Sequence, residues 1–273
     1  MTAAPATAYL ARPTGRIAYD ITGAGPLVIC LPGMGDLRSV YRFLAPVLAE
    51  GGFRVATMDL RGHGESDTTF DAYDDVAAGT DLVALAGHLG GPAILIGNSM
   101  GAAAACWAAA EAPKQTAGLV LLGPFVRNGS TTPLGKILFR LALLRPWGRA
   151  AWNAYFRTLY PTRHDAEFDA HSAEVVASLH RPGHWNAFQA TTRTSHDPVE
   201  ARLGEVHTPT LVVMGEKDPD WPDPTAEARW IAERLGARTL MVPNAGHYPQ
   251  AEFPEVVSPL VAEFARGVLQ PAA

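Results

Sequence analysis

Cysteine is scarce in this chain of 273 residues, which contains only Cys30 and Cys106. Cys30 lies in an apolar run and Cys106 in an alanine-rich helical stretch, so we interpret both as small buried hydrophobes rather than as a disulfide or a metal pair. Residues 1–13 have neither a basic start nor an apolar core, so a signal peptide is not expected. These absences predict a cytoplasmic protein.

Long apolar runs and an excess of basic residues are also missing. No stretch approaches the roughly 18 apolar residues of a membrane span. The best candidate, residues 133–147, is interrupted by Lys136, Arg140 and Arg145. The chain has 22 Lys and Arg against 27 Asp and Glu, a net charge of −5, which implies no basic surface for nucleic acid or anionic lipid. We therefore expect neither nucleic acid nor a membrane as a partner, and the oligomeric state stays open.

The familiar patterns for metals and nucleotides fail on their spacing. His180 and His184 are spaced like a zinc pair, but Pro182 and Gly183 break the helix that such a pair needs. The spacing from Gly129 to Gly135-Lys136 is one residue too long for a phosphate loop, and no Ser or Thr follows Lys136. We expect no metal and no nucleotide or redox cofactor.

Short apolar runs alternate with helical stretches along most of the chain. The expected strands are a hairpin of 8–12 and 17–21, then 28–31, 55–59, 94–96, 119–122, 211–214 and 239–242. The expected helices are 41–49, 76–89, 101–112, 224–235 and 255–269. The six later strand runs are nearly all apolar, as in parallel strands buried on both faces. This alternation predicts an α/β fold with a doubly wound, largely parallel sheet.

The alternation stops between residues 127 and 207, where no convincing buried strand is found. The segment is nevertheless rich in Leu, Phe, Trp and Tyr, and a structureless loop of this length is rare in a compact domain. We predict a helical insertion, with residues 127–207 forming a cap (lid) subdomain. Residues 1–126 and 208–273 would then form the core domain.

Residues 97–101 read Gly-Asn-Ser-Met-Gly, the G-x-S-x-G pattern. An expected strand precedes it and an expected helix follows, which is the context in which this pattern marks a nucleophilic serine. A sharp turn there projects the serine side chain out of the fold, and small neighbours allow the chain segments to approach closely. Ser99 is therefore the candidate nucleophile.

A serine hydroxyl needs a general base and an acid that orients the base. The strand at 211–214 is followed by Gly215-Glu216-Lys217-Asp218, and the strand at 239–242 by a loop containing His247. Both loops follow strand ends, where open α/β sheets bind ligands. His247 is the candidate base, the alternative being a buried histidine without a catalytic role. Asp218 is the candidate acid, with Asp220 and Glu216 as close alternatives.

From about residue 16 onward the chain resembles the α/β-hydrolase superfamily, in particular its capped serine esterases and cofactor-free haloperoxidase-like enzymes. Three further segments carry the resemblance: Leu-Pro-Gly-Met-Gly at 31–35, Asp-Leu-Arg-Gly-His-Gly-Glu-Ser at 59–66, and Asn-Ala-Gly-His-Tyr-Pro at 244–249. The resemblance implies an eight-stranded, mostly parallel sheet with a helical cap between strands six and seven. It also implies a catalytic triad of Ser99, His247 and Asp218.

The same resemblance implies an oxyanion hole formed by the main-chain N–H groups of Met34 and Met100, whose side chains we expect to line the pocket. The chain has Pro32-Gly33 where the family often has His-Gly, but a main-chain donor does not depend on that side chain. The resemblance makes His63 part of a structural loop rather than a second catalytic histidine. Three further polar residues are interpreted as turn or support residues: Asp36, Asp59 and Asn98.

Together these features predict a serine hydrolase that cleaves a carboxylic ester, lactone or thioester of a small, largely apolar substrate through an acyl-enzyme. The aromatic residues Trp152, Tyr155 and Trp185 of the insertion indicate, as a group, a bulky apolar site. A serine nucleophile argues against dehalogenase and epoxide hydrolase chemistry, which use a carboxylate. Perhydrolysis and C–C bond hydrolysis by the same triad stay open, as does a non-hydrolytic cyclase or ligand-binding role.

Overall fold

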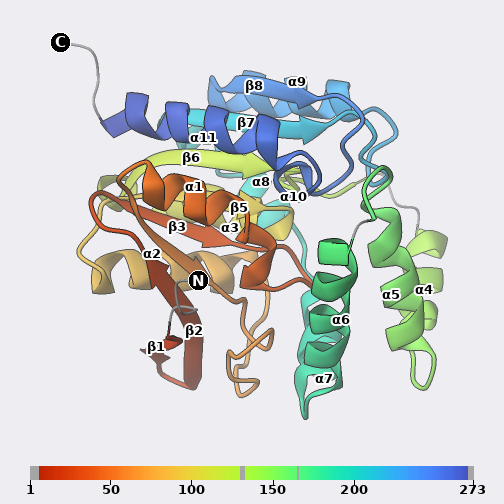
Figure 1. Cartoon of the computed structure of the whole chain (residues 1–273). Helices are drawn as coiled ribbons and strands as arrows, with labels where there is room; N and C mark the ends of the chain where they lie inside the picture. The colour runs from red at the N-terminus through yellow and green to blue at the C-terminus, as the bar shows by residue number, and fades with distance from the viewer. Residues whose placement is uncertain (1–5, 130–132, 165, 270–273) are drawn as a thin grey trace.

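The computed structural model describes residues 6–129, 133–164 and 166–269. Its centre is an eight-stranded sheet in the order β1-β2-β4-β3-β5-β6-β7-β8 (Figure 1). β2 pairs antiparallel with both of its neighbours, and the remaining pairs are parallel. The strands are β1 (Ala8–Arg12), β2 (Gly15–Thr22), β3 (Leu27–Leu31), β4 (Arg54–Met58), β5 (Ala93–Asn98), β6 (Thr116–Leu122), β7 (Thr210–Gly215) and β8 (Arg238–Val242). The predicted hairpin and the predicted mostly parallel sheet are confirmed.

Helices cover both faces of this sheet (Figure 1). One face packs against α1 (Leu44–Glu50) and α11 (Pro254–Leu269), and the other against α2 (Asp75–His88), α3 (Met100–Glu111) and α9 (Pro224–Leu235). Aspartate side chains cap two of these helices: Asp74 accepts the N–H of Ala77, and Asp223 accepts that of Ala226. Such N-caps satisfy main-chain donors that a helix leaves open, and they set where α2 and α9 begin.

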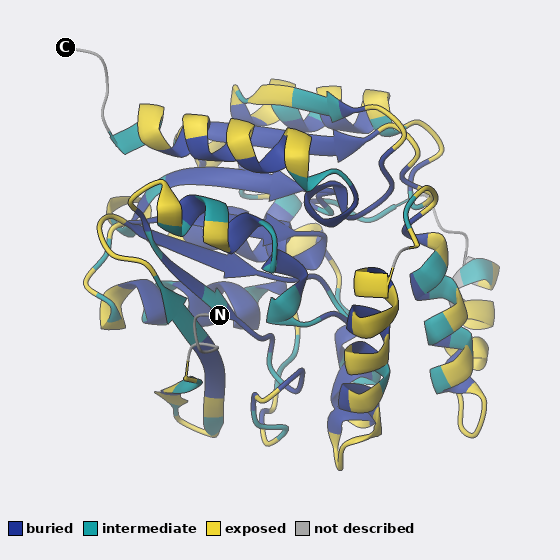
Figure 2. Ribbon diagram, in the orientation of Figure 1, coloured by how far each residue is buried: buried dark blue, intermediate teal, exposed yellow. Residues whose placement is uncertain are grey.

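The inner strands are apolar along their whole length because alternate side chains enter two different cores. In β3, Ile29 and Leu31 pack on the α2 and α3 side, whereas Val28 and Cys30 pack on the α1 and α11 side. Cys30 and Cys106 are buried free thiols, as expected. Figure 2 shows the inner strands buried and the outward turns of the covering helices exposed.

The strand β8 departs from this pattern. Its residues Arg238 and Thr239 are exposed, and only Val242 at its carboxyl end is buried. The expectation that all six later strands are buried on both faces is therefore wrong for β8. The reason is its position, because β8 is the last strand of the sheet and lacks a second neighbour.

The segment between β6 and β7 is helical, as predicted. It contains α4 (Pro133–Ala142), α5 (Gly148–Thr158), α6 (Ala166–His180), α7 (His184–Thr191) and α8 (Asp197–Glu200), and its described residues form no strand. Figure 1 shows α4 to α7 beyond the carboxyl ends of the parallel strands. Treating residues 127–207 as a separate cap subdomain stays a prediction. Within the described parts of the chain, no helix has the length and hydropathy needed to cross a membrane.

Candidate active site

Ser99 lies at the junction of β5 and α3, with φ +54° and ψ −120°. A positive φ is rare for a residue other than glycine and signals a strained turn. The main chain holds this turn, since the N–H of Ser99 donates to the carbonyl oxygen of Leu122 at 3.0 Å. A β-carbon on Gly97 would lie 2.1 Å from the carbonyl oxygen of Gly101, and one on Gly101 would lie 2.4 Å from that of Leu31. Both glycines of the pattern are therefore required by close approach of the main chain.

His247 lies in the loop after β8 and is held at its main chain and at its ring. Its N–H donates to the carbonyl oxygen of Leu159 at 2.9 Å, and its own carbonyl oxygen accepts from Nδ2 of Asn98 at 3.1 Å. The ring atom Nδ1 lies 2.8 Å from Oδ2 of Asp218, and both side chains are buried. Because a carboxylate only accepts, Nδ1 carries the proton, and Nε2 is left to act as a base.

The structure separates the three candidate acids. Asp218 hydrogen bonds directly to the ring of His247. Oδ2 of Asp220 lies 3.5 Å from the same nitrogen, and Asp220 accepts the hydroxyl of Tyr155. Glu216 is exposed. The arrangement therefore favours Asp218 as the orienting acid and places Asp220 as a second negative charge beside the ring.

Two opposing effects set the ionisation of His247. Burial lowers its pKa, but the neighbouring carboxylates of Asp218 and Asp220 outweigh burial and raise the pKa to about 9. The pKa of Asp220 is itself raised, chiefly by burial, while the charge of His247 opposes that rise. The imidazole is thus a stronger base than an ordinary histidine.

Ser99 and His247 line one cavity of about 800 Å³. Trp152 and Tyr155 from the insertion also line it, as expected, together with other aromatic side chains: Phe125, Phe139, Trp221 and Tyr248. Trp185 does not belong to this lining, because it is fully buried, with its ring centroid 5.1 Å from that of Phe188.

The two methionines behave differently. Met34 lines the cavity, as expected, and lies in a turn closed by the N–H of Asp36 and the carbonyl oxygen of Gly33 at 3.3 Å. Gly33 lies against Ser99, since a β-carbon there would be 2.7 Å from Cβ of Ser99. Met100 does not line the cavity, so that expectation is wrong: its side chain packs in the core on the α2 side. Its N–H remains available, because α3 begins at this residue and the first turn of a helix has no intrahelical acceptor.

His63 supports the turn that contains Met34. Nε2 of His63 accepts the N–H of Gly35 at 2.9 Å, and Nδ1 donates to the carbonyl oxygen of Arg61 at 2.9 Å. Burial lowers the pKa of His63 and so favours the neutral ring that this pattern needs. These contacts agree with the structural role expected for His63. Asn98 is likewise a support residue, since Nδ2 joins the carbonyl oxygens of Leu122 and His247.

Sequence reasoning missed two further buried Asp–His pairs. Oδ1 of Asp36 lies 2.7 Å from Nε2 of His171, and Oδ2 of Asp75 lies 2.6 Å from Nδ1 of His196. In each pair the aspartate belongs to the core and the histidine to the segment between β6 and β7. No local pattern marks them, because the partners are 135 and 121 residues apart.

Two carboxylates and the imidazole of the site are also residue types that can ligate a metal ion. Asp218, Asp220 and His247 offer ligand atoms within 4.8 Å of one another. A metal bound through Nδ1 would have to replace the proton that Asp218 accepts. The hydrogen bond between Asp218 and His247 accounts for the same geometry, and the absence of a metal requirement stays a prediction.

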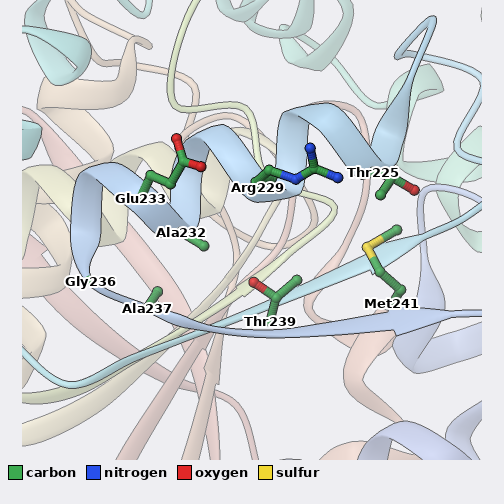
Figure 3. A pocket seen from close by; sticks show the side chains of 8 residues that line it. All are labelled: Thr225, Arg229, Ala232, Glu233, Gly236, Ala237, Thr239 and Met241. Atoms are coloured by element: carbon green, nitrogen blue, oxygen red, sulfur yellow. The ribbon is translucent and has the colours of Figure 1, made fainter.

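A second hollow, of about 420 Å³, lies between α9 and β8 (Figure 3). Arg229 and Glu233 of α9 and Thr239 of β8 supply its polar side chains, with Thr225 at one end. None of the candidate site residues lines this hollow. Its charged groups are also common on exposed helix faces, so we assign no chemistry to it.

Comparisons with known proteins give matches over most of the chain. Residues 28–260 match the model of the alpha/beta hydrolase family. A pimeloyl-[acyl-carrier protein] methyl ester esterase of Neisseria meningitidis is 29% identical over 249 residues, covering 89% of this chain and 77% of that protein. A 2-hydroxy-6-oxo-6-phenylhexa-2,4-dienoate hydrolase of Comamonas testosteroni is 30% identical, with 92% and 91% covered.

A solved structure is similar over nearly the whole chain. A thermophilic esterase from Thermogutta terrifontis has a TM-score of 0.77 and 26% identity, with 97% of this chain and 99% of that chain covered. The family match, the relatives and the sheet with its serine turn all support the same family assignment. This chain belongs to the alpha/beta hydrolase family and is a hydrolase.

Proposed function

We propose that this hydrolase is a serine esterase in which Ser99 is the nucleophile, His247 the general base and Asp218 the orienting acid. One observation carries the proposal: the strained turn of Ser99 and the Asp218-bound ring of His247 line the same cavity. The N–H groups of Met34 and Met100 are the proposed oxyanion donors. Such donors are typically worth two to three orders of magnitude in rate.

The proposed reaction proceeds through an acyl-enzyme. Oγ of Ser99 attacks the ester carbonyl carbon while Nε2 of His247 takes the hydroxyl proton. The tetrahedral intermediate expels the alcohol, which leaves with the proton from His247. A water molecule then attacks the acyl carbon with His247 again as base, releasing the carboxylic acid and restoring Ser99.

The walls of the cavity support a small, largely apolar substrate. Trp152 and Tyr155 of α5, Leu159 after it, and Phe125 and Trp221 from the core loops contribute apolar surface. Since α5 contributes to this wall, we propose that residues 127–207 act as a cap over a core of residues 1–126 and 208–273. A lactone or thioester would be cleaved by the same steps as an ester.

The test compares wild type with Ser99→Ala and with the control Ser258→Ala. Ser258 is buried in α11, and its hydroxyl has no hydrogen-bond partner among the described residues. A panel of 4-nitrophenyl esters measures turnover, and a fluorophosphonate probe followed by peptide mapping locates the nucleophile. We expect Ser99→Ala to lose at least about four orders of magnitude in kcat and all labelling, while Ser258→Ala stays near wild type. Labelling elsewhere, or turnover unchanged in Ser99→Ala, would refute the proposal.

A further inference from the structure

The described residues contain three buried Asp–His pairs, and their places relative to the cavity differ. The pairs Asp218–His247, Asp75–His196 and Asp36–His171 span 2.8, 2.6 and 2.7 Å. His247 and His196 line the cavity, whereas neither Asp36 nor His171 does. A purely structural pair needs no cavity, so His196 requires a separate explanation.

His196 is held as firmly as a catalytic histidine. Its ring is bound to Asp75 at the start of α2, and its N–H donates to Oδ1 of Asn128 at 3.2 Å. The N–H of Asp75 in turn donates to Oγ1 of Thr194 at 3.4 Å. Because Nδ1 donates to the carboxylate of Asp75, the imidazolium form of His196 has the N–H of Nε2 left to donate to a ligand. Nε2 has no partner among the residues that the structure describes.

The charged groups that line the cavity together with His196 differ in their hydrogen bonds and ion pairs. Asp197 also lines the cavity, and its two carboxylate oxygens accept from Nδ2 of Asn128 at 2.6 Å and from Oγ of Ser195 at 2.7 Å. Arg140 and Arg193 line the same cavity, and neither forms an ion pair with any described residue. The carboxylate of Asp197 is therefore already hydrogen-bonded, whereas the guanidinium groups of Arg140 and Arg193 are available to pair with a ligand. This arrangement suits a ligand of negative charge.

We infer that His196, together with Arg140 and Arg193, binds a carboxylate at the far end of the acyl chain of the substrate. This inference rests on the proposed esterase function and deepens it. Phe125 lies between the two histidines, its ring centroid 5.8 Å from that of His196 and 5.7 Å from that of His247. The chain would cross Phe125, with its ester at Ser99 and its carboxylate at His196. The substrate class is thus a half-ester of a dicarboxylic acid.

The test compares two substitutions of the same kind. His196→Asn keeps a side-chain N–H in place of the Nδ1 that contacts Asp75 and removes Nε2. His171→Gln is the matched change in the pair away from the cavity, because there Nε2 contacts Asp36, and the substitution keeps an N–H in its place and removes Nδ1. The substrates are 4-nitrophenyl hydrogen adipate, 4-nitrophenyl 6-hydroxyhexanoate and 4-nitrophenyl hexanoate. A lost hydrogen bond to a charged group corresponds to a change of at least about tenfold.

For the wild type we expect the KM for 4-nitrophenyl hydrogen adipate, whose chain ends in a carboxylate, to be lower than the KM for 4-nitrophenyl 6-hydroxyhexanoate or 4-nitrophenyl hexanoate. His196→Asn should raise the KM for the carboxylate ester at least about tenfold while leaving its kcat and the hexanoate kinetics near wild type. His171→Gln should leave the ratio of the KM values unchanged. No preference for the carboxylate ester, a preference for the hydroxyl ester, or an equal effect of the two substitutions would overturn the inference.

A separate measurement distinguishes failure of the esterase proposal from failure of this subsite. Calorimetric titration of Ser99→Ala with monomethyl adipate and with methyl hexanoate measures binding without turnover. If no ester is hydrolysed and Ser99 is not labelled, the esterase proposal fails. Tighter binding of monomethyl adipate by Ser99→Ala than by the double variant Ser99→Ala/His196→Asn would still support the subsite, and equal binding would overturn it.

Discussion

The pH dependence of kcat/KM tests the proposed base directly, because a general base works only in its neutral form. Burial lowers the pKa of His247, but Asp218 and Asp220 outweigh it and raise the pKa to about 9. An unperturbed histidine titrates near about 6.5. We therefore expect kcat/KM to rise with pH through the neutral range and to level off only above about 9.

Replacing Asp220 by Asn measures how much this one carboxylate contributes to the raised pKa of His247. The substitution removes a carboxylate 3.5 Å from Nδ1 of His247 and leaves the 2.8 Å contact with Asp218 in place. An opposite charge at this range shifts a pKa by about 1–3 units, and Asp220 is the more distant of the two carboxylates, so we expect a fall of about 1 unit. That corresponds to about 1.4 kcal/mol and to about ten times more neutral imidazole at pH 7. The substitution should thus increase kcat/KM at pH 7, even though the plateau falls with the weaker base.

The assay is a pH-stat titration of ester hydrolysis from pH 5 to pH 10, fitted for the acid limb. Glu216→Gln is the matched control, because it removes one exposed charge from the same loop and should not move the limb. Asp218→Asn should lower the plateau by about 10⁴-fold, since the ring loses the acceptor that fixes its tautomer. An acid limb that stays in place or moves to higher pH in Asp220→Asn would refute the electrostatic reasoning.

Two further predictions concern stability and are measured by denaturant unfolding. Gly97→Ala would place a β-carbon 2.1 Å from a main-chain oxygen and should cost about 3 kcal/mol or more, whereas Gly267→Ala, with open space in α11, should stabilise by about 0.5–1 kcal/mol. Equal effects of the two would contradict the close approach at the serine turn. Arg38→Met would leave the fully buried carboxylate of Asp59 without its ion-pair partner and should cost about 3–5 kcal/mol. Arg16→Met, in an ion pair whose arginine side chain is 58% exposed, should change the stability far less than Arg38→Met, and a similar loss in both would count against burial as the cause.

The sequence predicted the features that are determined by residues close together in the chain. The inner strands could be recognised because their residues are apolar on both faces, and Ser99 because its glycines, strand and helix are adjacent in the sequence. The prediction that the side chain of Met100 lines the cavity was wrong because the direction of this side chain depends on how α3 packs against the sheet. The pair Asp75–His196 was missed because α2 and the segment before α8 meet only in the folded chain.

These long-range contacts join the segment between β6 and β7 to the chemistry of the core. Leu159 at the end of α5 accepts the N–H of His247, and Tyr155 of the same helix donates to Asp220, one of the carboxylates that raise the pKa of His247. The insertion therefore contributes to the position and the basicity of the proposed base as well as to the wall of the cavity. Because this segment contacts the proposed base and contains His196 of the proposed subsite, we expect a change in its packing to alter substrate choice and pH dependence together. Under these proposals, specificity and chemistry cannot be assigned to separate structural units.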